Sequence, residues 1–156
     1  MIDTLAYRPL MTMYLDVAYA RARIVGDVPA GRRGMFPVDG GRFEGDRLRG
    51  TVLGDGADWV TWRPDGAMVI DVRLMLLTHD DALIAMHYVG LLCARTPDAQ
   101  AALQRREVIA YEDSYIRTTP RFETSDPRYA WLNRVIAVAN GHRAVEGPMY
   151  QVFEIE

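Results

Sequence analysis

The chain of 156 residues is long enough to close one hydrophobic core but too short to carry a separate cofactor-binding domain, so we expect residues 1–156 to form a single domain. Hydrophobic residues make up 49% of the chain and charged residues 25%, a composition that excludes disorder and collagen-like sequence. The formal net charge of −3, from 18 basic and 21 acidic residues, predicts neither a nucleic-acid partner nor a membrane partner.

The cysteine content and the N-terminal sequence predict a cytoplasmic protein. Cys93 is the only cysteine, so no internal disulfide can form. The first nine residues include Asp3 and Arg8 and lack the apolar core of a signal peptide. No stretch approaches the roughly 18 apolar residues that a membrane helix needs, because Asp71 and Arg73 interrupt the most hydrophobic run.

The first half of the chain alternates apolar and polar residues with a period of two, which predicts strands rather than helices. In residues 11–19, the side chains of Met11, Met13 and Leu15 share one face of such a strand. Glycine-containing turns separate the strands that follow. The expected elements are strands over residues 11–19, 32–38 and 47–53, a turn at residues 27–31 and a tight Asp-Gly-Gly turn at residues 39–41.

Residues 67–78 form the most informative predicted strand. A Pro-Asp-Gly turn at residues 63–66 leads into it, and residues 82–89 return as its hairpin partner. Its even positions are wholly apolar. Its odd positions are Val69, Asp71, Arg73, Met75 and Leu77. Because neither face is plainly polar, we expect both faces to be covered, which favours a barrel wall over a two-layer sandwich.

The second half contains the one helix that the sequence predicts, from Pro97 to about residue 106. Residues 115–124 are extended, and Pro120 marks an edge or a bulge. Further strands are expected over residues 129–139 and 149–155, with a hairpin turn at Asn140-Gly141. These serial hairpins predict an all-β fold, an antiparallel up-and-down β-barrel of about nine strands with one short helix.

Several stretches of uncommon sequence recur here in the order and spacing of a known family. They are Gly31-Arg32-Arg33, Gly40-Gly41-Arg42-Phe43-Glu44-Gly45, Leu48-Arg49-Gly50, Gly56-Ala57-Asp58-Trp59, Asp65-Gly66, Asp71-Val72-Arg73, residues 115–124 (YIRTTPRFET) and Tyr129-Ala130-Trp131-Leu132-Asn133. From about residue 24 to the C-terminus, the chain resembles uncharacterised protein family 0311, also catalogued as domain of unknown function 3237. The resemblance implies a lipocalin-like β-barrel and a homo-oligomer, and it implies no particular reaction. The chain departs from the family pattern at Asp81, where glycine is usual, and at Ile116, where an aromatic residue is usual.

Glu123, Arg117 and Arg121 form the strongest candidate site in the sequence. Like Tyr115, they occupy odd positions of one predicted strand, and all point to one side unless Pro120 breaks the alternation. A carboxylate beside two guanidinium groups can bind an anion, or Glu123 can act as a catalytic acid or base. The same pattern also fits a ladder of salt bridges on a solvent-exposed face.

Asp58 and Trp59 follow a glycine-rich turn, where Asp58 can serve as a general base and Trp59 as the floor of a pocket. Alternatively, Asp58 accepts hydrogen bonds from backbone amides and Trp59 fills the core. Asp71 and Arg73 share one face of the 67–78 strand, so each must be paired or face a wet cavity if that strand is buried. Arg73 is then either a clamp for a substrate carboxylate or phenolate, or one half of an internal ion pair.

Trp131 and Asn133 share a face of the predicted 129–139 strand and suit the orientation of a polar aromatic ligand. Core packing by the indole and backbone hydrogen bonding by Asn133 are the alternative. The three histidines lie in separate segments and no nucleotide-binding motif occurs, so the sequence predicts neither a metal site nor a cofactor.

These residues predict a cofactor-independent acid–base enzyme of isomerase, cyclase or lyase type, acting on a small aromatic or polyketide-like molecule in the barrel cavity. The catalytic candidates are Glu123 and Asp58, and the substrate-binding candidates are Arg73, Arg117, Tyr115, Trp59, Trp131 and Asn133. A carboxylate would move the proton, arginines would stabilise an enolate or phenolate, and the indoles would sandwich the ring. Two other hypotheses fit the same residues: a non-catalytic carrier or sensor of a small apolar ligand, and an oligomeric scaffold whose polar clusters are all interface ion pairs.

Overall fold

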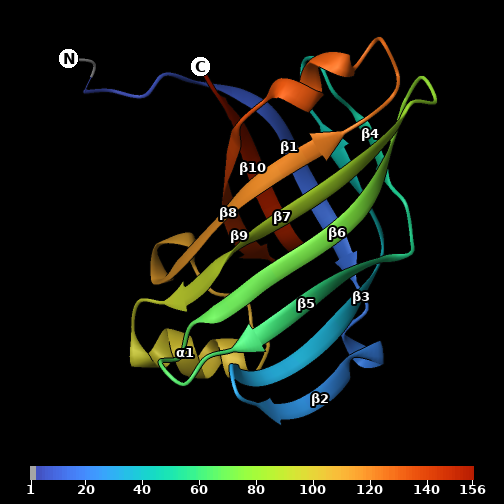
Figure 1. The fold of residues 1–156 in the computed structure, drawn as a ribbon. Coiled ribbons are helices and arrows are strands. Elements are labelled where there is room, and N and C mark those ends of the chain that lie inside the picture. Colours follow the sequence, from blue (N-terminus) through green and yellow to red (C-terminus); the bar gives the residue numbers. More distant parts are fainter. Residues whose placement is uncertain (1–2) are drawn as a thin grey trace.

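The computed structural model describes residues 3–156 and contains one antiparallel sheet that closes into a barrel (Figure 1). The strands are β1 (Tyr7–Val17), β2 (Arg23–Val28), β3 (Gly31–Glu44), β4 (Gly50–Val52), β5 (Gly56–Trp62), β6 (Met68–Thr78), β7 (Leu83–Ala94), β8 (Ser114–Glu123), β9 (Ala137–Ala144) and β10 (Gly147–Ile155). Eight of them, in the order β1–β10–β9–β8–β7–β6–β5–β3, surround the interior, and β3 closes the ring on β1. The other two, β2 and β4, are short additions beside β3. The predicted antiparallel β-barrel is confirmed, with ten strands in place of about nine.

The helical segments are short and lie between strands. They are α1 (Pro97–Gln104) and the 3₁₀ turns η1 (Tyr19–Arg21), η2 (Tyr111–Asp113) and η3 (Ala130–Arg134). Helix α1 begins where predicted, because the Thr96 side chain accepts a hydrogen bond from the Ala99 backbone N–H and Pro97 occupies the first turn. None of the helices in residues 3–156 has the length and apolar composition that a membrane-spanning helix requires.

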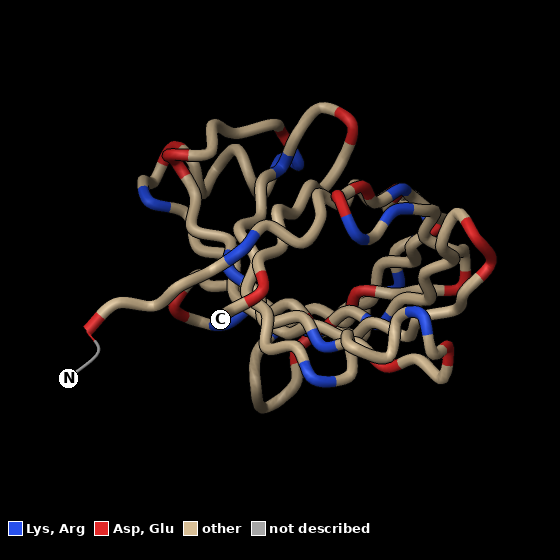
Figure 2. Tube along the Cα trace, turned by 90° about the horizontal axis from the view of Figure 1, so that it is seen from above, with Lys and Arg blue, Asp and Glu red and all other residues tan. Residues whose placement is uncertain are grey.

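The alternation along β6 separates the inside of the barrel from the outside. Ile70, Val72 and Leu76 face inward, and each is at most 1% exposed. Arg73 and Met75, at odd positions, are exposed on the outer wall. In the single chain the outer face of β6 is a partly exposed mixture of polar and apolar side chains, so the expected cover of this face by a partner subunit stays a prediction. Figure 2, which looks at the fold from above, shows acidic and basic positions interspersed along the trace.

The half of the barrel that holds β4 is filled by large apolar side chains. Those that are no more than 2% exposed include Phe43, Leu48, Leu76, Ile84 and Leu132. Burial of this kind stabilises the fold by roughly 1.5–3 kcal/mol per large side chain. The opposite half, near η1 and α1, contains the polar groups described below.

Two glycine-containing segments that the sequence predicts as turns, Gly40-Gly41 and Asn140-Gly141, lie inside strands. Gly40 and Gly41 are part of β3, and a Cβ on Gly41, whose φ is +143°, would lie 2.1 Å from the Tyr14 carbonyl oxygen. Gly141 lies within β9 facing inward, where a Cβ would meet the Ile116 side chain at 2.3 Å. These glycines permit close approach of neighbouring strands and side chains, which a sequence pattern does not distinguish from a turn.

The predicted strand over residues 129–139 is also wrong in its first half. Residues 130–134 form η3, and β9 begins only at Ala137. Tyr129 and Leu132 are the buried residues of this segment, at 6% and 1% exposure, and their spacing of three matches a 3₁₀ turn. The alternation of Tyr129, Trp131 and Asn133 is therefore not the alternation of a strand.

The turn between β6 and β7 contains Asp81 in the left-handed conformation, with φ of +67°. Because glycine adopts this conformation without a steric penalty, Asp81→Gly is expected to raise the free energy of unfolding by about 0.5 kcal/mol, and Asp81→Ala to lower it by about 1 kcal/mol. Urea denaturation of the two variants measures both changes. Equal stability of the Gly and Ala variants would contradict the assignment of strain to this position.

Candidate functional site

Asp58 is a carboxyl group on the inner face of the barrel wall. Its position on β5 is opposite Phe36 on β3 and Val72 on β6, and both of these neighbours are buried inside the barrel. The next residue, Trp59, points outward and is 43% exposed. The period-two alternation of β5 therefore places a single carboxylate, half-buried, among inward-facing apolar side chains.

The Asp58 carboxylate accepts a backbone hydrogen bond at a local gap in the β5–β6 ladder. The two strands pair through Asp58 and Val72 and resume pairing at Thr61 and Val69. Between these points, the Asp71 backbone N–H donates to Asp58 Oδ1 at 3.3 Å. Asp58 therefore accepts a backbone hydrogen bond, which was the alternative to a role as general base. Its carboxylate nevertheless faces the barrel interior.

The barrel environment makes Asp58 a weak acid. Burial raises its pKa from 3.8 to about 7, the negative charge of Asp71 adds to the rise, and the hydrogen bond from the Asp71 backbone partly opposes it. A carboxyl group with a pKa near neutrality is present in both protonation states at physiological pH. It can therefore accept and return a proton in one catalytic cycle.

Two buried phenols lie close to Asp58 inside the barrel. Tyr88 on β7 is opposite Val72, and its ring centre is 5.2 Å from that of Tyr150 on β10. Tyr88 is 1% exposed and Tyr150 is 6% exposed. Burial raises the pKa of both phenols, and the negative charge of Asp58 raises each further. Both phenols therefore stay protonated and can donate hydrogen bonds.

The Tyr88 hydroxyl is an unpartnered polar group in the barrel. Within residues 3–156 no group meets hydrogen-bond geometry with it, although the nearby Tyr150 hydroxyl contributes to its raised pKa. The buried Thr118 hydroxyl on β8 also forms no hydrogen bond among these residues. Leaving such a group unpaired costs about 1–3 kcal/mol. A ligand or a water molecule with a polar atom near Tyr88 would remove this cost, so these groups mark a place where a polar ligand atom can bind.

Aromatic and basic side chains surround the end of the barrel that lies beyond Asp58. Tyr19 in η1 packs edge-on against Phe36, with the ring centres 5.7 Å apart. The guanidinium groups of Arg143 and Arg106 lie 5.1 and 5.9 Å from the Tyr19 ring centre. Burial raises the pKa of Tyr19, and the positive charge of Arg143 partly offsets this rise. An aromatic ligand can stack here, and an anionic group on it would meet two positive charges.

The sequence does not identify Arg143 as a site residue, because Asn140-Gly141 is typical of a hairpin turn. In the structure it lies on β9 two positions beyond Gly141, on the inward face. Among the described residues it has no carboxylate partner within salt-bridge distance. Tyr88 and Tyr150 were also missed, although each hydroxyl occurs at an otherwise apolar, inward-facing position of its strand.

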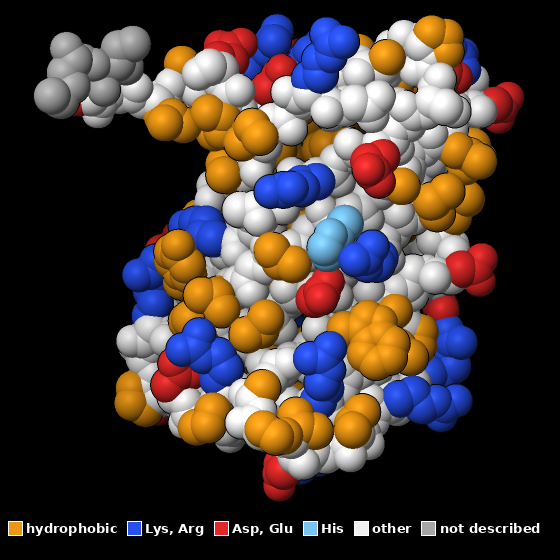
Figure 3. All heavy atoms as spheres, viewed as in Figure 1, with side chains coloured by type: hydrophobic (Ala, Val, Ile, Leu, Met, Phe, Trp, Pro, Cys, Tyr) orange, Lys and Arg blue, Asp and Glu red, His pale blue; other side chains and the backbone are white. Residues whose placement is uncertain are grey.

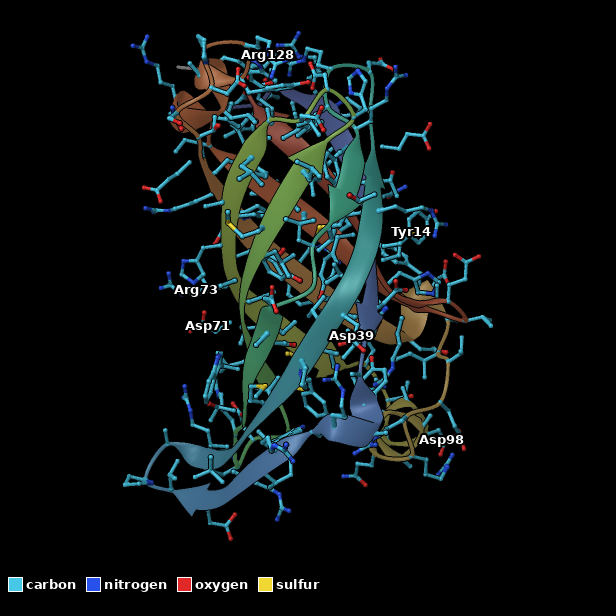
Figure 4. The ribbon with its side chains drawn as sticks, turned by 90° about the vertical axis from the view of Figure 1, so that its right-hand side faces the viewer. Tyr14, Asp39, Asp71, Arg73, Asp98 and Arg128 are labelled. Atoms are coloured by element: carbon cyan, nitrogen blue, oxygen red, sulfur yellow. The ribbon has the colours of Figure 1, made fainter. Side chains whose placement is uncertain are left out.

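Three of the predicted site residues meet in a groove on the outer wall of the barrel. Arg73, Glu123 and Asn133 contribute to this groove, which has a volume of about 670 Å³. The prediction that they project into the barrel is wrong, because the inward positions of β8 belong to residues such as Phe122. Charged and histidine side chains gather in the middle of this face in Figure 3, and Figure 4 shows Arg73 projecting away from the barrel.

Asn133 and Trp131 make structural contacts near the same groove. The Asn133 side chain accepts the Thr124 backbone N–H at 2.8 Å and donates to the Thr124 carbonyl at 2.9 Å, which ties η3 to the end of β8. The Trp131 ring lies 4.2 Å from the Arg47 guanidinium. Trp131 and the outward-facing Trp59 are on different elements, and nothing in residues 3–156 pairs their rings.

Arg117 and Tyr115 also lie on the outer surface, away from the groove. Arg117 donates to the Tyr111 hydroxyl at 3.0 Å and to the Ile116 carbonyl at 2.8 Å. Its guanidinium lies 4.8 Å from the Tyr115 ring centre. These contacts bind the connection after α1 to β8.

The histidines have separate environments. His87 Nε2 lies 2.8 Å from Asp71 Oδ1, and His142 Nε2 lies 3.2 Å from the Ile109 carbonyl oxygen. Among residues 3–156, no three His, Cys, Asp or Glu side chains come together in a way that would hold a metal ion.

The comparisons with known proteins agree with the fold. A family model described as a protein of unknown function (DUF3237) matches residues 5–155. The UPF0311 protein RPA1785 of Rhodopseudomonas palustris is 30% identical over 149 residues, covering 94% of this chain and 97% of that protein. The UPF0311 protein blr7842 of Bradyrhizobium diazoefficiens is 32% identical over 153 residues, covering 93% and 99%.

Solved structures show the same barrel. A conserved protein of unknown function from R. palustris superposes with a TM-score of 0.90 at 27% identity, with all of both chains covered. A beta-barrel like protein from Acinetobacter baumannii gives 0.85 at 30% identity, covering 100% of this chain and 99% of that one. An enzyme from Penicillium herquei gives 0.74 at 22% identity, covering 100% and 98%, and this similarity shows a shared fold alone.

Proposed function

This chain belongs to the DUF3237 family of proteins of unknown function, and since that description specifies no reaction, we propose a function from the geometry of the site. The protein is a cofactor-independent acid–base enzyme that moves a proton on a small phenolic or enolisable molecule bound at the Asp58 end of the barrel. Isomerisation, cyclisation and elimination all begin with such a proton transfer.

The observation that supports this proposal most strongly is the inward-facing Asp58 carboxyl, with its pKa near 7, beside the unpartnered Tyr88 hydroxyl. In the proposed reaction, the Asp58 carboxylate accepts a proton from a carbon next to a carbonyl group, or from a phenol. The electron pair of the broken bond moves onto the substrate oxygen. Tyr88 then donates a hydrogen bond to that oxygen, and Asp58 returns the proton to a different atom. No oxidant is consumed, and the substrate only rearranges or loses a leaving group.

Arg143 and the aromatic residues have supporting roles in this proposal. The Arg143 guanidinium stabilises the enolate or phenolate as it forms, and Tyr19 and Phe36 contact the ring of the substrate. A positioned general base contributes about 10²–10⁴-fold to a rate, and one preorganised donor to an oxyanion contributes about 10²–10³-fold.

Solvent deuterium exchange into 1-tetralone, followed by proton NMR, tests the proposal. The wild-type protein is expected to accelerate exchange at the carbon next to the carbonyl, with a rate that rises through pH 7 and levels off above it, because the carboxylate form is the base. Asp58→Asn is expected to lower the rate by about 10²–10⁴-fold, and Tyr88→Phe by about 10–10²-fold. Asp55→Asn, which removes an exposed carboxylate from the preceding turn, is the matched control and should retain the wild-type rate. A wild-type rate in Asp58→Asn would contradict the proposal.

A carrier or sensor is the second candidate function, and the aromatic lining supports it. Tyr19, Phe36 and Trp62 are in successive edge-to-face contact at this end of the barrel, an arrangement that binds a flat ligand without requiring chemistry. Native mass spectrometry of freshly purified protein distinguishes the two functions. A carrier holds an unchanged ligand in both the wild-type protein and Asp58→Asn, whereas the enzyme turns its ligand over only when Asp58 is present.

A further inference from the structure

The outer groove contains a row of basic side chains. Arg73 on β6 is directly opposite His87 on β7, and His87 is directly opposite Arg121 on β8. The three side chains therefore lie side by side on the outer wall, on neighbouring strands that are about 4.8 Å apart. His87 lies between the two arginines, so one anion placed over the imidazole ring can contact both guanidinium groups.

The two arginines of this row have no such anion within the chain. No carboxylate among residues 3–156 lies within salt-bridge distance of Arg73 or Arg121. Both guanidinium groups line the groove. Their hydrogen-bond donors are available to a ligand.

His87 is held in place by Asp71. The distance of 2.8 Å between His87 Nε2 and Asp71 Oδ1 orients the imidazole ring between the two arginines. Asp71 and Arg73 project together from the outer side of the barrel wall in Figure 4. Asp71 is thereby engaged with the histidine and leaves the Arg73 guanidinium free.

The remainder of the groove is partly apolar and partly acidic. Met75 and Ala85 form its floor one step further along the strands, and Val135 and Ile136 contribute from the segment after η3. Its volume of about 670 Å³ lies within the 300–1,000 Å³ that small-molecule sites commonly have. Glu123 lies on the same groove, so a second negative charge on a ligand would be repelled.

We propose that the outer groove binds a monocarboxylate with an apolar body, separate from the Asp58 site inside the barrel. The carboxylate lies over His87 and accepts hydrogen bonds from Arg73 and Arg121. The apolar body packs against Met75 and Ile136. This proposal is independent of the acid–base function, because the β6–β7–β8 wall separates the groove from the barrel interior.

Isothermal titration calorimetry with 2-naphthoate, together with amide NMR shift mapping, tests the proposal. The wild-type protein is expected to bind 2-naphthoate, with shifts centred on β6–β8 and residues 133–136. Arg73→Gln and Arg121→Gln are each expected to weaken binding at least about fivefold, and the double variant at least about 25-fold. Arg23→Gln, which removes an exposed arginine on β2, is the matched control and should bind as the wild type does. Asp58→Asn should also retain the affinity, which separates this site from the proposed catalytic one.

Two neutral or smaller probes test the chemistry of the ligand. 2-Naphthalenemethanol, which lacks the charge, should bind at least about tenfold more weakly than 2-naphthoate, and inorganic phosphate, which lacks the apolar body, should also bind more weakly. The proposal is overturned if the double arginine variant keeps the wild-type affinity, if the shifts map to the barrel interior, or if phosphate binds as tightly as 2-naphthoate. Absence of 2-naphthoate binding up to about 10 mM overturns it as well.

Discussion

Asp58→Asn is expected to make the protein more stable at pH 8, by an amount that largely disappears at acidic pH. The folded structure raises the pKa of this carboxyl from 3.8 to about 7, so folding is penalised wherever the unfolded chain would carry the carboxylate. The penalty is absent below pH 3.8, grows as the pH rises towards 7, and is complete above it. The gain in unfolding free energy for the Asn variant should therefore increase by about 3 kcal/mol between pH 4.5 and pH 8.

Thermal unfolding at the two pH values measures this effect. An increase of about 3 kcal/mol corresponds to a rise in Tm of roughly 6–12 °C for a chain of this length. Asparagine keeps a side-chain oxygen that can accept the Asp71 backbone N–H, so the ladder contact at this point is retained. Asp55→Asn changes an exposed carboxyl and should show no such dependence on pH. If the gain from Asp58→Asn were equal at pH 4.5 and pH 8, its carboxyl would not be desolvated as the structure indicates.

This expected result connects stability with function. A neutral amide of the same shape would serve the fold better than a half-buried carboxyl, so the carboxyl at position 58 lowers stability at neutral pH. Ionisable groups that lower the stability of the folded protein are common at functional sites, because activity there requires a shifted pKa at the cost of stability. The paired loss of exchange activity and gain of stability in one variant would be strong support for a catalytic Asp58.

The fold could be predicted from the sequence where alternation alone decides the structure. The inward residues of β6 are the even positions of an uninterrupted period-two pattern, and the Pro-Asp-Gly turn before it joins β5 to β6 as expected. The errors fall at glycines and at the start of β9. Positions 41 and 141 require glycine because another strand or side chain approaches the backbone closely. A single sequence does not show which part of the chain makes that approach.

The candidate site was predicted only in part, because it depends on register between strands that are far apart in the sequence. Asp58 was identified from its own segment. Its proximity to Tyr88 exists because both residues are opposite Val72, on β5 and β7 respectively. The sequence did show Glu123 and Arg121 on one side of β8, but it could not show that this side is the outside of the barrel. Asn133 forms hydrogen bonds with the Thr124 backbone, which was the alternative to orienting a ligand.

Leu76→Ala tests whether packing in the filled half of the barrel can be weakened without changing the reaction at the Asp58 end. Leu76 is fully buried between Val52 on β4 and Ile84 on β7, so its truncation leaves a cavity and should cost about 2–5 kcal/mol. Leu83→Ala, the same change at a side chain that is 50% exposed, should alter stability by no more than about 0.5 kcal/mol. Urea denaturation measures both changes.

The same variant should leave the chemistry at the other end of the barrel intact. Leu76 lies four residues beyond Val72 on β6, or roughly 13 Å along the strand, so its cavity does not reach Asp58 or Tyr88. At a temperature where the variant remains folded, its 1-tetralone exchange rate is expected to match the wild-type rate. A large loss of exchange in folded Leu76→Ala would mean that the apolar packing positions the Asp58 end directly, and the two halves would then have to be treated as one cooperative site.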